Sequence, residues 1–461
     1  MALIPSRGGF IPTSLTDWLT GQDVDRMSRY RAMLDFYNGQ QWERRRRAGE
    51  TRLTANYARA LVRKTASYVL SEPPSFSIAP SAADGVSEQL ADAVETRLND
   101  LALEQDWGTL DFDTMVDAAV LGDGAFKITW DPDTSQPVIT SVDPSGLWAW
   151  TRPDNIRAVT RVVQRYELSA PDAYDLFGVP ARGSGAIMGS GSVPVVEDWR
   201  ADRMIVEVGG EEVHDEPNPY GWIPYVIFPN VARPHELWGE SDLTDLIDIC
   251  RELNRRLSVV ARILQVSGNP IAVLENVTGS DGIRADEGAV WELPEGSRAY
   301  LLDMLASGGV RLHIDYIDAL YRALYDLAET PRTAFGDSGR NVSGAALEVE
   351  IQPLVQKVMR KRRVWDAVYR QRNAKVLDLL ERFGGETIGG VRRTSVVWGS
   401  VLPSDRSALV SDEVQLVGAR IHSRRTAMNL LGDVDQEREL GLVLEEEDEF
   451  SRRGSGHDDV G

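Results

Sequence analysis

Residues 241–266 read SDLTDLIDICRELNRRLSVVARILQV. Ser241 is a residue type that caps helix N-termini, and Asp242 and Asp245 follow in the first turn, where the helix dipole favours acids. Apolar residues then recur every three or four positions, which predicts one amphipathic helix over 240–267. Its apolar side consists of Leu243, Leu246, Ile247, Cys250, Leu253, Leu257, Val260 and Leu264.

A second amphipathic helix is predicted over 309–330 by the same spacing. The apolar residues on its face are Leu312, Tyr316, Leu320, Leu324 and Leu327. The segment 268–308 between the two helices favours three short strands, near 271–274, 289–293 and 298–302. The two helices are therefore predicted to form a hairpin that carries a small separate head.

The sequence beyond the hairpin predicts a loop over 331–342 and then a very long helix over 343–383, which ends at Gly384-Gly385. Pro353 lies well inside this helix. Because proline has no backbone N–H and crowds the preceding turn, we expect it to kink the helix near Val349. A strand over 391–398, a helical C-terminal domain over 405–446 and a loose tail over 452–461 are expected to follow.

The part before the hairpin predicts helices first and strands afterwards. The expected helices cover 22–37, 56–70, 86–103 and 108–121. The expected strands cover 125–130, 137–142, 159–168, 193–198 and 204–208. The glycine-rich stretch 181–194 is predicted to be a long loop, because its glycines do not follow the dinucleotide-binding pattern. The expected fold class is α+β and mainly helical, without regular βαβ alternation.

The composition excludes several classes of protein. A chain of 461 residues is long enough for roughly three compact units, and 42% hydrophobic with 26% charged residues is ordinary for a globular protein. The single cysteine, Cys250, excludes a disulfide framework and cysteine-based zinc sites, and its place on the apolar stripe predicts a buried thiol. No apolar run approaches a membrane span or a signal peptide, so we expect a soluble protein without a membrane partner.

No motif of enzyme chemistry is evident. The phosphate-binding G-x-x-x-x-G-K-[ST] loop and the G-x-S-x-G elbow do not occur, and the five histidines are scattered. Asp111 and Asp113 fall at an expected helix start, where acids act as caps. Asp242, Asp245 and Asp248 could line a cation site, but a solvated helix face is favoured. No enzyme activity, metal or cofactor is therefore expected.

Two observations bear on nucleic acids. The net charge of −21 argues against a general nucleic-acid coat protein, because DNA affinity comes mainly from phosphate neutralisation. The basic run Arg44–Arg47 is interpreted as a solvated face, with a phosphate site as the alternative.

Several stretches, in this order, resemble the portal proteins of tailed double-stranded DNA bacteriophages of the siphophage type. The strongest is 223–246, IPYVIFPNVARPHELWGESDLTDL, in which a strand leads into the helix start described above. The others include 30–39 (YRAMLDFYNG), 56–76 (NYARALVRKTASYVLSEPPSF), 118–130 (AAVLGDGAFKITW), 341–357 (NVSGAALEVEIQPLVQK), 396–402 and 422–426 (HSRRT). Together they cover most of residues 22–450.

The resemblance implies a structural, non-enzymatic protein that forms a ring, usually of twelve subunits, at one capsid vertex of the virion after assembly in the host cytoplasm. The subunit parts would be an N-terminal wing region over 1–239, stem helices over 240–267 and 309–330, a clip over 268–308, a tunnel loop over 331–342, a kinked helix and wing strand over 343–402, and a crown with a tail over 403–461. Implied partners are the terminase large subunit, the head–tail adaptor, capsid and scaffolding proteins, and double-stranded DNA that passes without sequence preference.

Individual residues receive roles from this arrangement. Arg332 and Arg340, in the tunnel loop, would touch DNA phosphates transiently, or would pair with acids of a neighbouring subunit. Pro353 would mark the helix kink. Stem packing or the subunit interface would use Leu246, Leu253, Leu257, Leu320 and Leu324.

The acidic charge fits a conduit that attracts DNA only weakly, although it could serve solubility alone. The alternatives are another ring-forming head–tail adaptor without DNA passage, and a DNA-processing enzyme of unfamiliar fold.

Overall fold

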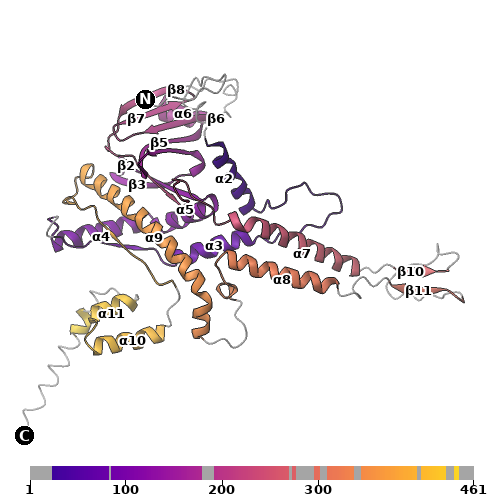
Figure 1. The fold of residues 1–461 in the computed structure, drawn as a ribbon. Coiled ribbons are helices and arrows are strands. Elements are labelled where there is room, and N and C mark those ends of the chain that lie inside the picture. The colour runs from indigo at the N-terminus through magenta and orange to yellow at the C-terminus, as the bar shows by residue number, and fades with distance from the viewer. Residues whose placement is uncertain are drawn as a thin grey trace, which may run out of the picture. The chain divides into compact units, whose positions relative to one another are not determined.

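The computed structural model describes most of the chain. The described ranges are 23–81, 85–178, 192–268, 272–276, 295–301, 309–336, 344–401, 406–431 and 441–445. The chain divides into two compact units, Met1–Gly399 and Ser400–Gly461. The first unit combines helices with antiparallel sheets (Figure 1), which confirms the prediction of a mixed α and β chain.

Four helices open the first unit, each within two residues of its predicted bounds. They are α2 (Val24–Tyr37), α3 (Tyr57–Val69), α4 (Glu88–Glu104) and α5 (Trp107–Leu121). The side chain of Asn56 accepts a hydrogen bond from Arg59 N (3.2 Å) at the start of α3, and Ser87 caps α4 in the same manner. Because α3 contacts α5, α7 and α9, this helix lies at the centre of the helical part.

Two antiparallel sheets follow. The smaller has the order β3-β2-β9, and the larger has the order β4-β5-β6-β7-β8 with α6 (Ala170–Phe177) packed on β5 and β6. The strands are β2 (Asp123–Asp131), β3 (Gln136–Ser141), β4 (Leu147–Arg152), β5 (Asn155–Ser169), β6 (Ser192–Trp199), β7 (Arg203–Val208), β8 (Glu211–Pro217) and β9 (Tyr225–Pro229). A partly buried ion pair between Lys127 of β2 and Glu197 of β6 (2.6 Å) links the two sheets.

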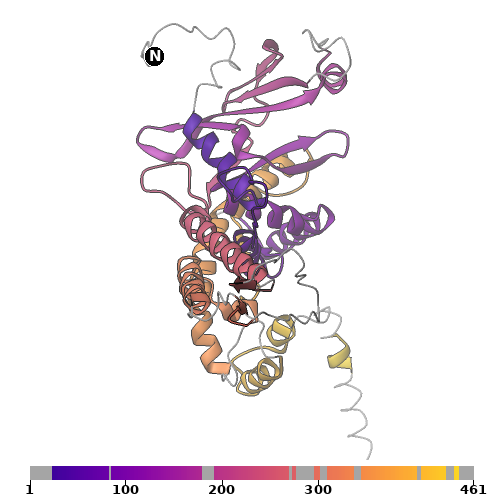
Figure 2. The ribbon, with the colours of Figure 1, turned by 90° about the vertical axis from the view of Figure 1, so that its right-hand side faces the viewer.

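The hairpin consists of α7 (Ile247–Gly268) and α8 (Gly309–Leu327), which pack side by side (Figures 1 and 2). The regular α-helix begins later than expected, because a 3₁₀ turn over Thr244–Leu246 precedes it. Directly before that turn, Ser241 Oγ accepts from Leu243 N (3.1 Å). Cys250 is buried as predicted. On α8 the buried residues include Ile317, which the predicted stripe omits, whereas Leu312 is exposed.

Two short strands lie in the segment between α7 and α8. They are β10 (Ala272–Glu275) and β11 (Arg298–Leu301), which pair antiparallel with Val273 opposite Tyr300. The strand predicted near 289–293 lies outside the described residues. The assignment of 268–308 as a clip, and the other part boundaries, stay predictions.

The long helix α9 runs without interruption from Gly344 to Arg382 and contains Pro353. It contacts α3, β2, β3 and β9, so it joins the helical part to the smaller sheet. Its fully or nearly fully buried apolar residues are Leu354, Val358, Trp365, Val368, Tyr369, Val376, Leu377, Leu379 and Leu380. The kink near Val349 stays a prediction. After α9, β12 (Ser395–Val397) pairs with β1 (Ser75–Ser77), and this strand is shorter than the predicted 391–398.

The second unit is helical in its described part. It contains α10 (Arg406–Gly418) and α11 (Arg424–Leu431), which pack against each other. Ser423 Oγ accepts from Thr426 N (3.0 Å) at the start of α11, and His422 Nδ1 lies 2.9 Å from the buried Glu413 carboxylate. These contacts fix the turn between the two helices.

Candidate functional site

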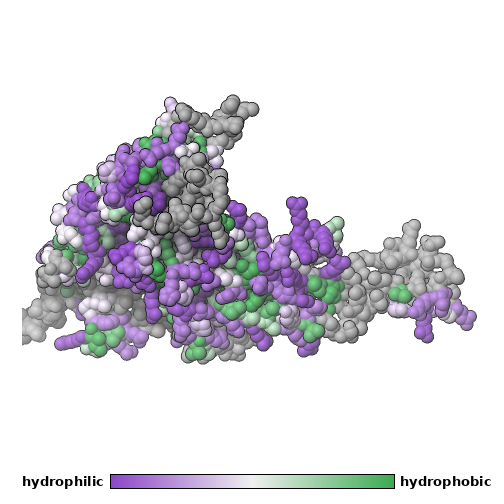
Figure 3. Space-filling view, turned by 45° about the horizontal axis from the view of Figure 1, so that its top comes forward, coloured by the Kyte–Doolittle hydropathy of each residue, from purple (hydrophilic) through white to green (hydrophobic). Residues whose placement is uncertain are grey.

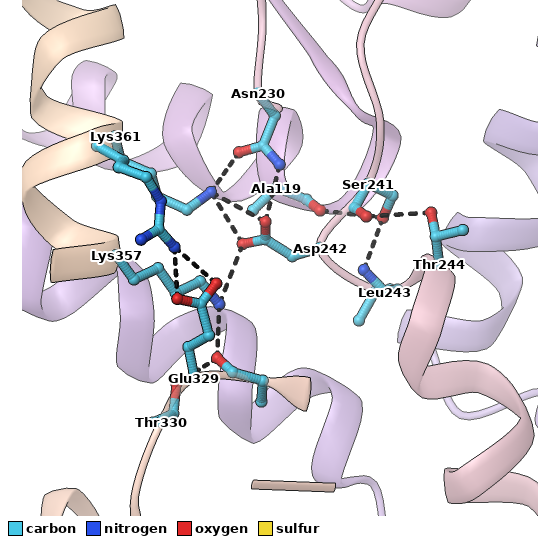
Figure 4. Close-up of polar contacts among 12 residues, drawn as sticks. Ala119, Asn230, Ser241, Asp242, Leu243, Thr244, Glu329, Thr330, Lys357 and Lys361 are labelled. Carbon is cyan, nitrogen blue, oxygen red and sulfur yellow. Dashed lines mark hydrogen bonds and ion pairs between the residues drawn. The ribbon is translucent and has the colours of Figure 1, made fainter. Parts of the chain in front are cut away.

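A cavity of about 400 Å³ lies where three elements meet: the segment leading into α7, the end of α8 and the middle of α9. Its charged lining residues are Glu240, Asp242, Asp245, Glu329, Lys357, Arg360 and Lys361. We call the set Asn230, Asp242, Glu329, Lys357, Arg360 and Lys361 the polar junction (Figure 4). It is of interest because the predicted tunnel loop begins directly after it in the chain.

Asp242 and Lys361 form the buried centre of the polar junction. Lys361 Nζ lies 2.9 Å from Asp242 Oδ2, and the two side chains are 7% and 6% exposed. Asn230 completes the set, because its Oδ1 accepts from Lys361 Nζ (2.5 Å) and its Nδ2 donates to Asp242 Oδ1 (2.9 Å). Every charged group at this centre therefore has an opposite charge and an amide as partners.

Burial and charge act in opposite directions on the two titrating groups. Burial by itself would raise the pKa of Asp242, but the positive charges of Lys361 and Lys357 and the hydrogen bond from Asn230 outweigh it and lower that pKa to about 2. Burial lowers the pKa of Lys361, and the Asp242 carboxylate opposes that effect. The carboxylate is thus firmly ionised at neutral pH.

An outer layer of the polar junction holds the chain directly after α8. Lys357 Nζ donates to Ala328 O (2.9 Å), and Arg360 forms an ion pair with Glu329. Glu329 has a left-handed backbone conformation (φ 50°), and this conformation costs energy in a non-glycine residue. Thr330 is fully buried. Two bases of α9 therefore fix the backbone from which the predicted tunnel loop departs.

The segment that supplies Asp242 is itself held against the end of α5. Asp242 N and Ser241 Oγ both donate to Ala119 O, at 2.9 and 3.1 Å. Gly122 makes this approach possible, because its φ is +106° and a Cβ there would lie 2.9 Å from Ser241 N. Asp242 is thereby placed by the α5–β2 connection.

The predicted site residues fall in different places. Arg332 is exposed in a 3₁₀ turn (Arg332–Phe335), and Arg340 lies outside the described residues. Leu246, Leu253 and Leu324 are buried in one apolar cluster that the hairpin shares with α2, α3 and α5, and Leu257 and Leu320 pack against it. Their contact with DNA or with a neighbouring subunit stays a prediction.

Two aspartates differ from their expected roles. Asp242 was expected to be a helix-dipole acid on a solvated face, but it is buried in the polar junction. Asp111 was expected to be a cap, but it is 1% exposed and forms an ion pair with the fully buried Arg372. The only local signal for the polar junction is Lys357 and Lys361, two of five lysines in the chain, spaced one helical turn apart.

The polar junction can position a backbone, because its charges are directed at each other and at the main-chain carbonyl of Ala328. Among the described residues no group of three or more His, Cys, Asp or Glu side chains could hold a metal ion. No helix in the described part of the chain is long and apolar enough to cross a membrane.

A protein-family model described as phage portal protein, SPP1 Gp6-like, matches residues 17–452 of the 461. A search of the curated proteins found no match.

Proposed function

We propose that this chain, which belongs to the SPP1 Gp6-like family of phage portal proteins, forms a twelvefold ring through which double-stranded DNA enters and leaves the head. Because the family match covers nearly the whole chain, this chain is a structural portal protein of a bacteriophage. The proposal adds the subunit number, the docking partners and the roles of individual parts.

One observation supports the assembly of this chain into a ring. Several large apolar side chains of the α7–α8 hairpin are exposed in the single chain, and Figure 3 shows such residues among hydrophilic ones along this region. They are Val259, Leu264, Leu312, Ile314, Tyr316 and Leu327, with Leu312 72% exposed. Because water-exposed apolar surface is unfavourable, contact between neighbouring hairpins would stabilise an assembly. The hairpin thus has an inner side for its own fold and an outer side for copies of itself.

The β10–β11 segment is the proposed docking site for the terminase large subunit and later for the head–tail adaptor. It lies between the two arms of the hairpin, so it can be removed with little loss of core. Deleting 271–306 and joining the arms by a short turn should leave the rest of the chain folded and abolish DNA packaging. A deletion variant that still packages DNA would exclude this docking role.

The predicted tunnel loop is proposed to project into the channel, with Arg332 and Arg340 as transient phosphate contacts. The polar junction supports this proposal because it gives the loop a fixed origin at Ala328–Thr330. Replacing both arginines by alanine should leave rings intact and alter packaging or DNA retention. Loss of the ring would instead indicate pairing with a neighbouring subunit.

Native mass spectrometry with negative-stain microscopy tests the ring. The parent chain should give closed rings whose opening admits duplex DNA, and Leu312→Ser with Ile314→Ser should shift the population to smaller species. The matched control replaces Leu103 and Leu176, two exposed leucines outside the hairpin, by serine and should assemble normally. A parent chain that stays monomeric at every concentration and salt tried would refute the proposal.

A further inference from the structure

The connection between α2 and α3 is a basic loop that lies along α7. Residues 44–47 within it are four consecutive arginines. Two hydrogen bonds fasten its second half to α7: Leu53 N donates to Ser258 Oγ and Ala55 N donates to Asn254 Oδ1, both at 2.9 Å. Asn254 and Ser258 are one helical turn apart, so one face of α7 holds the loop (Figure 1). We call residues 42–54 the arginine loop.

A fifth arginine, Arg52, shapes the arginine loop from inside. Its side chain is only 14% exposed and pairs with Glu50 Oε1 at 2.9 Å. Its Nη1 and Nη2 donate to the carbonyls of Arg44 (2.5 Å) and Arg45 (3.1 Å), and its guanidinium lies 4.8 Å from the centre of the Trp42 ring. The backbone of the arginine run is therefore held in one conformation before any partner binds.

The side chains of the run carry charge that the fold does not use. All four are exposed, and those of Arg44, Arg45 and Arg47 form no ion pair within the described part of the chain. The nearest acids are engaged elsewhere, because Glu43 pairs with Arg251 (3.3 Å) and Arg255 (3.6 Å) of α7. Glu50 pairs with Arg52 and accepts a hydrogen bond from the backbone N of Arg47 (2.8 Å), but it forms no ion pair with the Arg47 side chain. The run thus leaves unpaired positive charge at one place in a chain whose net charge is −21.

Such clustering is unfavourable for the isolated chain, because adjacent like charges repel. Three arginines elsewhere in the first unit have an acid beside them: Arg152 pairs with Asp154, Arg203 with Asp215 and the partly exposed Arg233 with Glu236. The arginine loop differs from them because its unpaired arginines are consecutive or nearly so in the chain. A loop whose backbone is already fixed and whose arginines are unpaired is suited to bind a partner with a high density of negative charge.

We propose that the arginine loop binds the phosphate backbone of DNA without reading its sequence. Duplex DNA carries one negative charge per about 1.7 Å of its axis, and guanidinium groups can contact phosphate oxygens in pairs. The inference rests on the proposed portal function for the identity of the polyanion. Since the rest of the chain is acidic, the contact is local and strongly weakened by salt.

The test measures binding of the purified full-length chain to a short fluorescent duplex of mixed sequence, by anisotropy, over a range of salt concentrations. The variant replaces Arg44, Arg45 and Arg47 by alanine. The matched control replaces Arg152, Arg203 and Arg233 by alanine, which changes the net charge by the same amount. A third variant replaces Arg44, Arg45 and Arg47 by lysine, which keeps the charge and removes the paired guanidinium contact.

Each phosphate contact contributes about −0.9 to the slope of log affinity against log salt concentration. The alanine variant should therefore lose about two to three units of slope, whereas the control should keep the parent slope. The lysine variant should keep most of the slope and bind more weakly than the parent. Two sequences of different base composition should bind the parent equally.

Several outcomes would overturn the inference. Equal losses in the alanine variant and the control would assign the effect to overall charge. A parent that forms rings but binds no DNA would remove the arginine loop's role and leave the portal function standing. Normal DNA binding with failed ring assembly in the alanine variant would indicate an acidic surface of a second copy as the partner. DNA binding by a chain that forms no ring, lost only in the alanine variant, would support the arginine loop and reject the ring.

Discussion

Two buried ion pairs attach the long helix α9 to the rest of the first unit, and they are built differently. Arg372 is fully buried, pairs with Asp111 of α5 at 2.5 Å, and has the rings of Trp107, Tyr369 and Phe126 within 4.5–5.4 Å of its guanidinium carbon. The second pair, Lys361 with Asp242, lies at the edge of a cavity among polar partners.

The difference shows in how each charge is satisfied. Around Arg372, one carboxylate and several aromatic faces take the place of water, and its Nε and Nη2 atoms make no hydrogen bond in the described part of the chain. In the second pair, the Asn230 amide contacts Lys361 and Asp242, and Lys357 adds a second positive charge near Asp242. The Arg360–Glu329 ion pair lies outside them. Around the first pair, removal of one member leaves the other without a charged partner in an apolar core. In the polar junction, removal of one residue leaves other polar partners in place. Substitutions in the two pairs should therefore lower the free energy of unfolding by different amounts.

The largest effect is expected for Arg372→Met. The substitution leaves the carboxylate of Asp111 buried without its partner, and breaking a buried pair in this manner costs about 3–5 kcal/mol. Urea unfolding of the variant should show that loss in the free energy of unfolding. Arg372→Met combined with Asp111→Leu should recover much of it, because neither charge then remains buried. A double variant no more stable than the single one would mean that the aromatic contacts of Arg372 are what matters.

A smaller loss is expected for Lys361→Met. Asp242 would keep Asn230 and the more distant Lys357, whose Nζ lies 4.0 Å from Asp242 Oδ2, so we expect about 2 kcal/mol. Lys357→Met serves as the matched control, since it removes the same charge from the same helix and should cost less. Equal losses in the two lysine variants would show that the inner and outer layers of the polar junction do not differ.

The pH dependence follows from the lowered pKa of Asp242. A carboxyl whose pKa is about 2 in the folded chain and 3.8 when unfolded stabilises the fold above about pH 4, and this contribution disappears as the pH falls from 3.8 toward 2. It amounts to about 2 kcal/mol at neutral pH. Unfolding experiments across this range should show a shallower acid-induced loss in Lys361→Met than in the parent. Parallel curves for the two proteins would contradict the assigned cause.

The helices could be predicted from sequence because their signals are local. The apolar spacing along α7 and the capping residue Asn56 lie within a few residues of what they determine. The strand β8 was missed, because its sequence EEVHDEP is that of an exposed edge strand and has no apolar alternation. Local pattern therefore specified the helical hairpin better than the larger sheet.

The polar junction could not be predicted, since its partners are remote in the chain. Asp242 is 119 residues from Lys361, and Asp111 is 261 residues from Arg372. At the level of sequence each acid is indistinguishable from a helix-terminal acid, which is why both received that role. Only the three-dimensional structure, in which α9 brings Arg372 beside Asp111 and Lys361 beside Asp242, shows that these acids are buried.

The smallest effect on stability, and the most informative for the polar junction, is expected for Arg360→Ala. The Arg360–Glu329 pair is half exposed, so its loss should change the free energy of unfolding by less than about 1 kcal/mol. Its local effect should be larger, because Glu329 has a left-handed backbone directly before the predicted tunnel loop. The amides of Ala328, Glu329 and Thr330 bond back to the last turn of α8, and hydrogen exchange should speed up at these three positions. Arg152→Ala, which removes another exposed pair far along the chain, should leave them unchanged. Faster exchange without a loss of stability would show that the Arg360–Glu329 pair restrains the backbone from which the loop departs. Unchanged exchange would show that Lys357 and the buried pair restrain it without Arg360.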